Sequence, residues 1–264
     1  MPDVDTTIIR AAIALTCASV VSLVAWRKRL LGPGGAVAAV IIGSALVAFG
    51  GWWAGILLFS FFLTSSLLST SDHDHPSRTW LQVVANGAPA TAFSILAFVF
   101  VAPSWLIASA ATIAAATADT WATEIGRRSG ATPVSVRTFR PAPIGTSGAV
   151  SLPGTLASIA GAMVIAILAA LLAPLATMPV SIGFPELLAI VFCGTIGSLV
   201  DTVLGAIFQA RYRCLTCGFR TEDPSTHDAS HKLVPKSGVS WLTNDAVNLT
   251  ASGIAGVIAA FIVR

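Results

Sequence analysis

The sequence predicts an all-α, polytopic integral membrane protein, because it is strongly apolar, contains long apolar segments and sorts its basic residues between alternate loops. Hydrophobic residues make up 55% of the 264 residues and charged residues only 10%, and the mean hydropathy is +0.83. A soluble domain carries roughly 25% charged residues, so the soluble globular class is excluded. We expect residues 1–264 to form a single membrane domain within the lipid bilayer, with no nucleic-acid partner.

Eight apolar segments follow one another, which allows six to eight transmembrane helices. The first is followed by Arg27-Lys28-Arg29, the reverse of the charge order in a cleavable signal peptide, so we expect it to remain as a span. The second and third meet at Gly50-Gly51-Trp52-Trp53, where the tryptophans suit a membrane interface; these two segments form either separate spans or a re-entrant pair. The segments cover residues 7–25, 35–50, 53–70, 80–101, 104–124, 149–173, 185–208 and 245–263.

Basic residues gather in every second connection, at residues 27–34, 71–79, 125–148 and 209–244. Loops rich in lysine and arginine stay in the cytoplasm. We therefore expect these four loops to be cytoplasmic and both termini non-cytoplasmic, in the cell (inner) membrane. The loops hold 13 of the 15 basic residues, namely Arg27, Lys28, Arg29, Arg78, Arg127, Arg128, Arg137, Arg140, Arg211, Arg213, Arg220, Lys232 and Lys236.

Polar residues within or at the ends of the apolar segments lie toward the same side as the basic loops. Ionisable residues in membrane segments are costly and usually mark a functional site. The sequence therefore predicts an active site at the cytoplasmic leaflet. The residues concerned are Asn86, Asp119, Glu124, Asp201, Asn244, Asp245 and Asn248.

Asp119 and Glu124 close the fifth segment. They are five residues apart, so they do not stack on a regular helix, but both reach one ion if the helix end is frayed. Mg²⁺ takes carboxylate oxygens and completes its shell with phosphates and water. The sequence predicts a magnesium site here; the alternative is a pair of salt bridges to Arg127 or Arg128.

Two further segments contribute acidic or amide side chains. Asp201 lies on the same face of the seventh segment as several glycines, which explain close helix packing but not the carboxylate. Asn244, Asp245 and Asn248 open the eighth segment. An Asn-Asp pair is an ordinary helix cap, but a second asparagine one turn deeper favours a metal or nucleotide role.

Two other groups favour phosphate binding. Arg78, Gln82 and Asn86 recur every four residues and share one helix face; the alternative is hydrogen bonding between helices. A Gly/Ser/Thr turn opens the next helix, where free N–H groups favour anions, and Arg137 and Arg140 lie just before it. A simple loop-to-helix turn is the alternative. The turn consists of Gly145, Thr146, Ser147 and Gly148.

The last polar loop, at about residues 209–243, contains two cysteines and two histidines. Zinc uses such spacings, and a loop on the reducing side of the membrane favours a metal or free thiols over a disulfide. A structural Zn²⁺ site and a loop with free thiols are therefore the two interpretations. The four residues are Cys214, Cys217, His227 and His231.

Four motifs follow one another between residues 118 and 248. They are Ala118-Asp119-Thr120-Trp121-Ala122-Thr123-Glu124-Ile125-Gly126, Gly145-Thr146-Ser147-Gly148, Asp201 with Gly205-Ala206 and Gln209, and Asn244-Asp245-Ala246-Val247-Asn248. Together they resemble a widespread, transmembrane-protein-19-like family of multi-span membrane proteins, which includes the plant and cyanobacterial phytyl-phosphate kinase of tocopherol and phylloquinone synthesis. More faintly, their order resembles the CTP-dependent polyprenol and phytol kinases.

The resemblance implies that an isoprenoid monophosphate such as phytyl phosphate receives a phosphoryl group from a nucleoside triphosphate, expected to be CTP, and becomes a diphosphate. Phosphoryl transfer needs mainly positioning and charge stabilisation. In this scheme Asp119, Glu124, Asp201 and Asp245 hold Mg²⁺. Phosphate oxygens are neutralised by Arg78, Arg137, Arg140 and the turn from Gly145 to Gly148.

Two other functions stay open. A membrane nucleotidyl- or phospho-alcohol transferase acting on a lipid substrate would share the metal site but release pyrophosphate or CMP. A transporter of an anionic solute would carry its carboxylates nearer the membrane midplane, and the one-sided placement of the polar residues disfavours it. The sequence predicts no particular oligomeric state.

Overall fold

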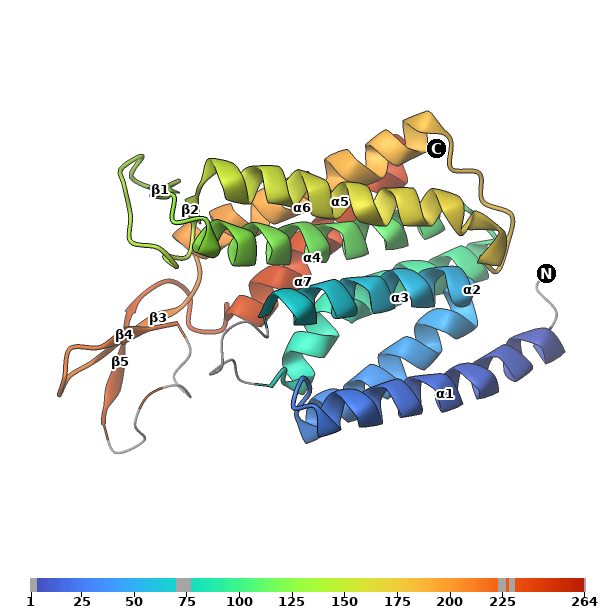
Figure 1. Cartoon of the computed structure of the whole chain (residues 1–264), viewed down its shortest axis with the longest axis horizontal. Coiled ribbons are helices and arrows are strands. Elements are labelled where there is room, and N and C mark those ends of the chain that lie inside the picture. Colours follow the sequence, from blue (N-terminus) through green and yellow to red (C-terminus); the bar gives the residue numbers. More distant parts are fainter. Residues whose placement is uncertain (1–3, 70–76, 223–226, 228–230, 264) are drawn as a thin grey trace.

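The computed structural model describes residues 4–69, 77–222, 227 and 231–263. Within these residues the chain forms a bundle of long helices with two small antiparallel strand assemblies at one end (Figure 1). The helices are α1 (Val4–Arg27), α2 (Pro33–Ser69), α3 (Trp80–Phe100), α4 (Ser104–Arg128), α5 (Leu152–Leu171), α6 (Phe184–Ile207) and α7 (Asn244–Ile262), with a short 3-10 helix η1 (Ala173–Leu175). Strands β1 (Val134–Ser135) and β2 (Ala149–Val150) pair with each other, and β3 (Arg211–Cys214) lies between β4 (Arg220–Thr221) and β5 (Leu233–Ser237).

The predicted all-α, multi-span architecture is confirmed. Among the described residues, six helices are long and apolar enough to cross a membrane. Helix α4 is long enough but less apolar than these six. The three-stranded sheet was not predicted; it occupies the loop that follows α6.

Helix α4 lies at the centre of the bundle, in contact with α2, α3, α5, α6 and α7. Every residue from Leu106 to Ala118 is buried. Most of them are alanine, serine or threonine, and such small side chains let neighbouring helices approach closely. Because other helices shield α4 from lipid, it tolerates the polar residues that lower its hydropathy.

Helix α2 turns back on itself at Gly51, which has a left-handed φ of 82°. A side chain at this position would collide with the backbone near Leu175, and Gly51 forms a backbone bridge with Ala176. The two halves of α2 therefore run in opposite directions (Figure 1). Counted separately, they give the eight helical segments expected from the sequence. The bend at Gly51 is packed against other helices: Trp53 is fully buried, and its Nε1 donates to the Ala169 carbonyl on α5, 2.8 Å away. Trp53 therefore does not lie at the membrane interface that the sequence suggested.

The described parts of the predicted basic loops lie at one end of the bundle, which we call the basic end (Figure 1). The connection before α2 meets the start of α3 there, where the Gly32 N–H donates to the Arg78 carbonyl at 2.9 Å. Both strand assemblies lie at this end, whereas the start of α1 and the end of α7 lie at the other. Helix α1 therefore begins, and α7 ends, at the end opposite the basic loops; the non-cytoplasmic placement of this end stays a prediction.

Candidate functional site

Two cavities lie toward the basic end, and a third runs from there toward the bend of α2 at Gly51; neighbouring cavities share wall residues. The apolar groove, of about 270 Å³, lies between α1, both halves of α2 and α3. The central chamber, of about 790 Å³, is lined by the α1–α2 connection, α3, α4 and α7. The glycine-turn cavity, of about 490 Å³, is lined by α4, α5, α6 and the turn from Gly145 to Gly148. Arg78, Gln82 and Asn86 are common to the first two cavities, and Asp119, Thr123 and Asn244 to the last two.

Asp119 and Asp201 meet at the glycine-turn cavity. They come from α4 and α6, and both line this cavity. Asp201 Oδ2 is buried and has no hydrogen-bond partner among the described residues. A buried carboxylate oxygen without a partner is costly, so this pair has the donor chemistry and the unmet demand of a cation site.

Small residues explain why these two helices bring their carboxylates together. A side chain at Gly194 would collide with Ala114, and one at Gly197 would collide with Ala115. The glycines therefore let α6 lie directly against α4. Asp201 follows Gly197 by about one turn, which carries it to the level of Asp119.

The glycine turn fits its place through two left-handed residues. Gly145 and Gly148 have φ of 83° and 74°, and a side chain at Gly148 would collide with the backbone of Ala206 on α6. The sequence predicted that the turn opens a helix directly. In the structure it does not, because β2 and the N-cap Ser151 come between it and α5. The start of α5 still faces the cavity, since Ser151 and Gly154 line it.

Glu124 lines the central chamber, as Asp119 does. Helix α4 continues to Arg128, so its end is not frayed at Glu124 as the metal interpretation assumed. Glu124 is 7% exposed, and its Oε2 lies 3.6 Å from Arg128 Nη2. The Ser69 hydroxyl donates to its Oε1 at 3.5 Å. The salt bridge that was the alternative therefore exists, and it leaves Glu124 in the chamber wall.

Arg78 stands where the apolar groove meets the central chamber. Its guanidinium lies over the rings of Phe61 and Phe62, 5.9 and 5.2 Å from their centroids. Burial lowers the pKa of Arg78 to about 10, against the opposing charge of Glu124. The side chain is therefore still cationic at neutral pH, at the polar end of an apolar groove.

Gln82 and Asn86 follow Arg78 along the same wall, and both also serve α3. Gln82 forms a capping box with Thr79, whose backbone N–H donates to Gln82 Oε1 at 3.0 Å. Asn86 Nδ2 donates to the Gln82 carbonyl at 2.9 Å. The alternative to phosphate contact was hydrogen bonding between helices. The bonds found here instead lie within α3 and its N-cap.

Some predicted residues lie away from the cavities. Asn244 and Asn248 line the central chamber, but Asp245, in the first turn of α7, is not part of either polar cavity wall. Arg137 and Arg140 are exposed in the connection between β1 and β2 and line no cavity described here.

Charged residues other than those predicted lie at or next to the glycine-turn cavity. Arg127 and Glu222 line the glycine-turn cavity. Arg211 Nη2 donates to the carbonyls of Gly205 and Ser147, at 3.1 and 3.4 Å, and its Nε lies 3.4 Å from Glu222 Oε1. Sequence spacing gave no signal for Arg211 or Glu222, because the sheet that carries them was not predicted.

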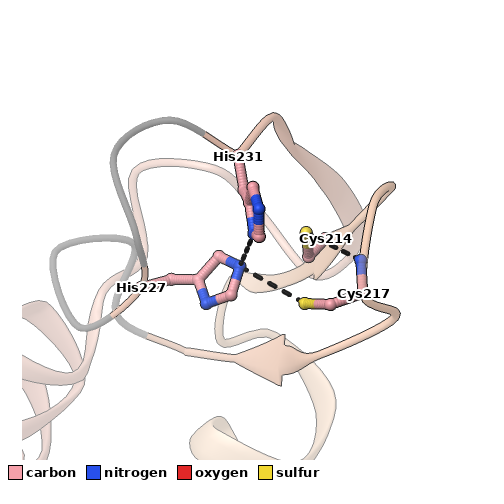
Figure 2. Close-up of side chains that lie close together, drawn as sticks. All are labelled: Cys214, Cys217, His227 and His231. Atoms are coloured by element: carbon pink, nitrogen blue, oxygen red, sulfur yellow. Dashed lines mark hydrogen bonds between the residues drawn. The ribbon is translucent and has the colours of Figure 1, made fainter.

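The two cysteines and two histidines come together in and around the three-stranded sheet (Figure 2). Backbone N–H groups of Cys217 and Thr216 donate to Cys214 Sγ, at 3.4 and 3.3 Å. The bond from Cys217 is the main reason that the pKa of the Cys214 thiol falls to about 6. The predicted grouping of Cys214, Cys217, His227 and His231 is present in the fold.

Comparisons with known proteins place the chain among membrane proteins. An uncharacterized membrane protein of Methanocaldococcus jannaschii is 34% identical over 225 residues, covering 79% of this chain and 88% of that protein. Protein PGR of Arabidopsis thaliana is 25% identical over 271 residues, covering 92% of each. Protein VTE6, chloroplastic, of Arabidopsis thaliana is 28% identical over 141 residues, covering 53% of this chain and 33% of that protein. No solved structure matches the chain.

One family model spans nearly the whole fold. The model described as integral membrane protein DUF92 matches residues 16–256, which run from α1 into α7. This range contains every residue that lines the central chamber and the glycine-turn cavity. The family resemblance predicted from the motifs is confirmed, and the protein is a member of the DUF92 family of integral membrane proteins.

Proposed function

We propose that this protein is a Mg²⁺-dependent lipid-phosphate kinase that converts an isoprenoid monophosphate into its diphosphate with a nucleoside triphosphate, CTP being the expected donor. The observation that supports the proposal is a row of three connected cavities. Arg78 lines both the apolar groove and the central chamber, and Asp119 lines both the central chamber and the glycine-turn cavity. The reaction takes place at the basic end, which the positive-inside rule assigns to the cytoplasmic leaflet.

The apolar groove is suited to the lipid chain of the acceptor. Its wall is almost entirely apolar, with Leu58 and Phe59 from α2 and Val21 from α1, and its polar end carries Arg78. A phosphate at that end would meet a cation that is partly shielded from water, where charge-assisted hydrogen bonds are strong. The resemblance to the family of the phytyl-phosphate kinase makes an isoprenoid chain the first candidate for the acceptor.

The glycine-turn cavity is suited to the triphosphate of the donor. The turn holds two glycines with left-handed φ, and the start of α5 faces the same space. Helix N-termini and turn N–H groups attract phosphate oxygens. Arg127 adds a positive charge at the wall. With the acceptor phosphate in the central chamber, the two substrates would meet beside Asp119.

The carboxylates between the two substrates are suited to Mg²⁺. Asp119 lines both polar cavities, Asp201 contributes an oxygen without a described partner, and Glu124 lies on the chamber side. These oxygens are the hard donors that Mg²⁺ prefers. When bound, the ion neutralises charge on the transferring phosphoryl group. Asp119 and Asp201 would hold it, with Glu124 as a ligand or as the group that orients Arg78.

The reaction balances without a side-chain base. One oxygen of the lipid phosphate forms a bond to the γ-phosphorus, and the bond from that phosphorus to the β–γ bridging oxygen breaks, releasing the nucleoside diphosphate. A phosphate monoester has a second pKa of about 6, so the acceptor is largely a dianion at neutral pH. The protein residues bind and orient the two phosphates, and Arg78 and Arg127 offset their mutual repulsion.

The product of labelled CTP tests the proposal. The protein in lipid nanodiscs is given phytyl phosphate, Mg²⁺ and CTP labelled at either the α- or the γ-phosphate. We expect a lipid diphosphate that carries the γ-label and never the α-label. An α-labelled lipid would instead identify a nucleotidyltransferase. If neither label reaches the lipid with CTP, ATP, GTP or UTP, the kinase proposal is wrong.

A further inference from the structure

A cluster of two cysteines and two histidines lies outside the three cavities and has no part in the proposed phosphoryl transfer. Cys214 ends β3, Cys217 follows in the turn toward β4, and His227 and His231 precede β5. Their ligand atoms all lie within 4.8 Å of one another, and Figure 2 shows the four side chains directed toward a common centre. Cys214 is buried, and the other three side chains are more open.

Two of the distances between these ligand atoms match the edges of a tetrahedral zinc site. With Zn–S near 2.3 Å and Zn–N near 2.0 Å, a tetrahedron separates S from N by about 3.5 Å and N from N by about 3.3 Å. Cys217 Sγ lies 3.5 Å from His227 Nε2, and His231 Nδ1 lies 3.4 Å from the same His227 Nε2. A hydrogen bond between two imidazole nitrogens would be expected to be shorter, near 3 Å.

Neighbouring groups hold two of the ligands in orientation. Cys214 Sγ accepts the backbone N–H groups of Thr216 and Cys217, an arrangement that favours the thiolate form that binds metals. The ring of Phe219 stacks on His227, with centroids 5.1 Å apart and planes 15° from parallel. Both cysteines are free thiols in the fold. The cluster therefore presents ligands that are already oriented by the surrounding sheet.

We infer that Cys214, Cys217, His227 and His231 bind one structural Zn²⁺ ion that fixes the three-stranded sheet at the basic end. Four protein ligands complete a tetrahedral shell, which is typical of structural zinc and leaves no position for a substrate. Such a small sheet has little hydrophobic core of its own, so metal binding supplies part of its folding free energy.

The sheet in turn supports the glycine turn. Glu222, just after β4, accepts from Gln209 Nε2 at 2.9 Å, and the Ser147 hydroxyl lies 3.4 Å from Gln209 Oε1. Arg211 on β3 donates to the Ser147 carbonyl. Zinc at the far end of the sheet would thus hold one wall of the glycine-turn cavity in place, without touching either substrate.

Metal content and thiol reactivity test this inference independently of any enzymatic activity. Purified wild-type protein and a Cys17→Ser control, in which the removed cysteine lies on α1, should each contain about one zinc per chain by elemental analysis. Cys217→Ser and His231→Ala should contain less than about a tenth of that amount. Cobalt added after chelation should give the absorption bands of tetrahedral cobalt–thiolate in wild-type protein and not in the variants.

A second measurement covers variants that do not fold. In wild-type protein, zinc should protect Cys214 and Cys217 from alkylation, and chelation should expose them, while the reactivity of Cys17 stays the same. The inference is overturned if wild-type protein prepared with zinc contains none and its loop thiols react alike with and without zinc. It is also overturned if Cys217→Ser retains zinc at the wild-type level. Neither result bears on the kinase proposal, which rests on the other cavities.

Discussion

Asp119 on α4 and Asp201 on α6 line one cavity, just beyond the point where Gly194 and Gly197 let the two helices lie against each other. Two carboxylates in a poorly solvated place repel each other, and Asp201 Oδ2 has no hydrogen-bond partner among the described residues. A cation bound between them would relieve both costs. Asp119 lines both the central chamber and the glycine-turn cavity. A metal bound to it would therefore contact both proposed substrates.

Arg78 should govern use of the lipid phosphate. Losing one charge-assisted contact costs about 1.5–3 kcal/mol, so Arg78→Gln should lower kcat/KM for phytyl phosphate about tenfold to hundredfold and change the KM for CTP little. Arg137→Gln is the matched control, because Arg137 is exposed and lines none of the cavities. Initial rates with each substrate varied provide the measurement. Equal losses in the two variants would remove Arg78 from the phosphate site.

Gly148 should be needed for the shape of the donor cavity. Gly148→Ala and Gly130→Ala both place a side chain at a left-handed φ, which costs each about 1–2 kcal/mol. Only at Gly148 would the new carbon collide with Ala206, since Gly130 has nothing within 4 Å. We expect Gly148→Ala to raise the KM for CTP strongly while Gly130→Ala stays near wild type. Nucleotide titrations at saturating lipid would show this, and a normal KM in Gly148→Ala would contradict it.

The apolar groove should select for long acceptors. Ala39 lines the groove, whereas Val37, two residues earlier on α2, is 61% exposed and does not. Ala39→Phe should reduce activity on phytyl phosphate and spare a short prenyl phosphate, because only the long chain needs the filled space. Val37→Phe should leave both activities unchanged. If Ala39→Phe kept wild-type activity on phytyl phosphate, the lipid chain would have to lie outside the apolar groove.

Much of the fold could be predicted from the sequence, because bilayer length and basic loops constrain a membrane chain so strongly. The eight segments and the gathering of the basic loops follow from these constraints. So does the meeting of Asp119 with Asp201, since a carboxylate in an apolar helix needs a polar surrounding. The placement of Asn244 on the chamber wall follows from the same pattern.

The remainder depends on tertiary contacts that spacing alone does not encode. Arg137 and Arg140 precede the glycine turn in sequence, but the pairing of β1 with β2 carries them into solvent. Asp245 shares its helix turn with Asn244, yet the packing of α7 turns the asparagines to the chamber. Arg211 and Glu222 reach the turn through a sheet whose strands are too short to show a sequence pattern.

Mn²⁺ binding, followed by the loss of the free-ion electron paramagnetic resonance signal, tests the central claim most directly. Asp119→Asn and Asp201→Asn should each weaken binding at least about tenfold, since even an outer-shell change commonly costs that much, and both should lose labelled diphosphate formation. Asp245→Asn, a carboxylate outside both polar cavity walls, should bind Mn²⁺ like wild type. Wild-type binding in the first two variants, or its loss in Asp245→Asn alone, would contradict a metal shared by α4 and α6.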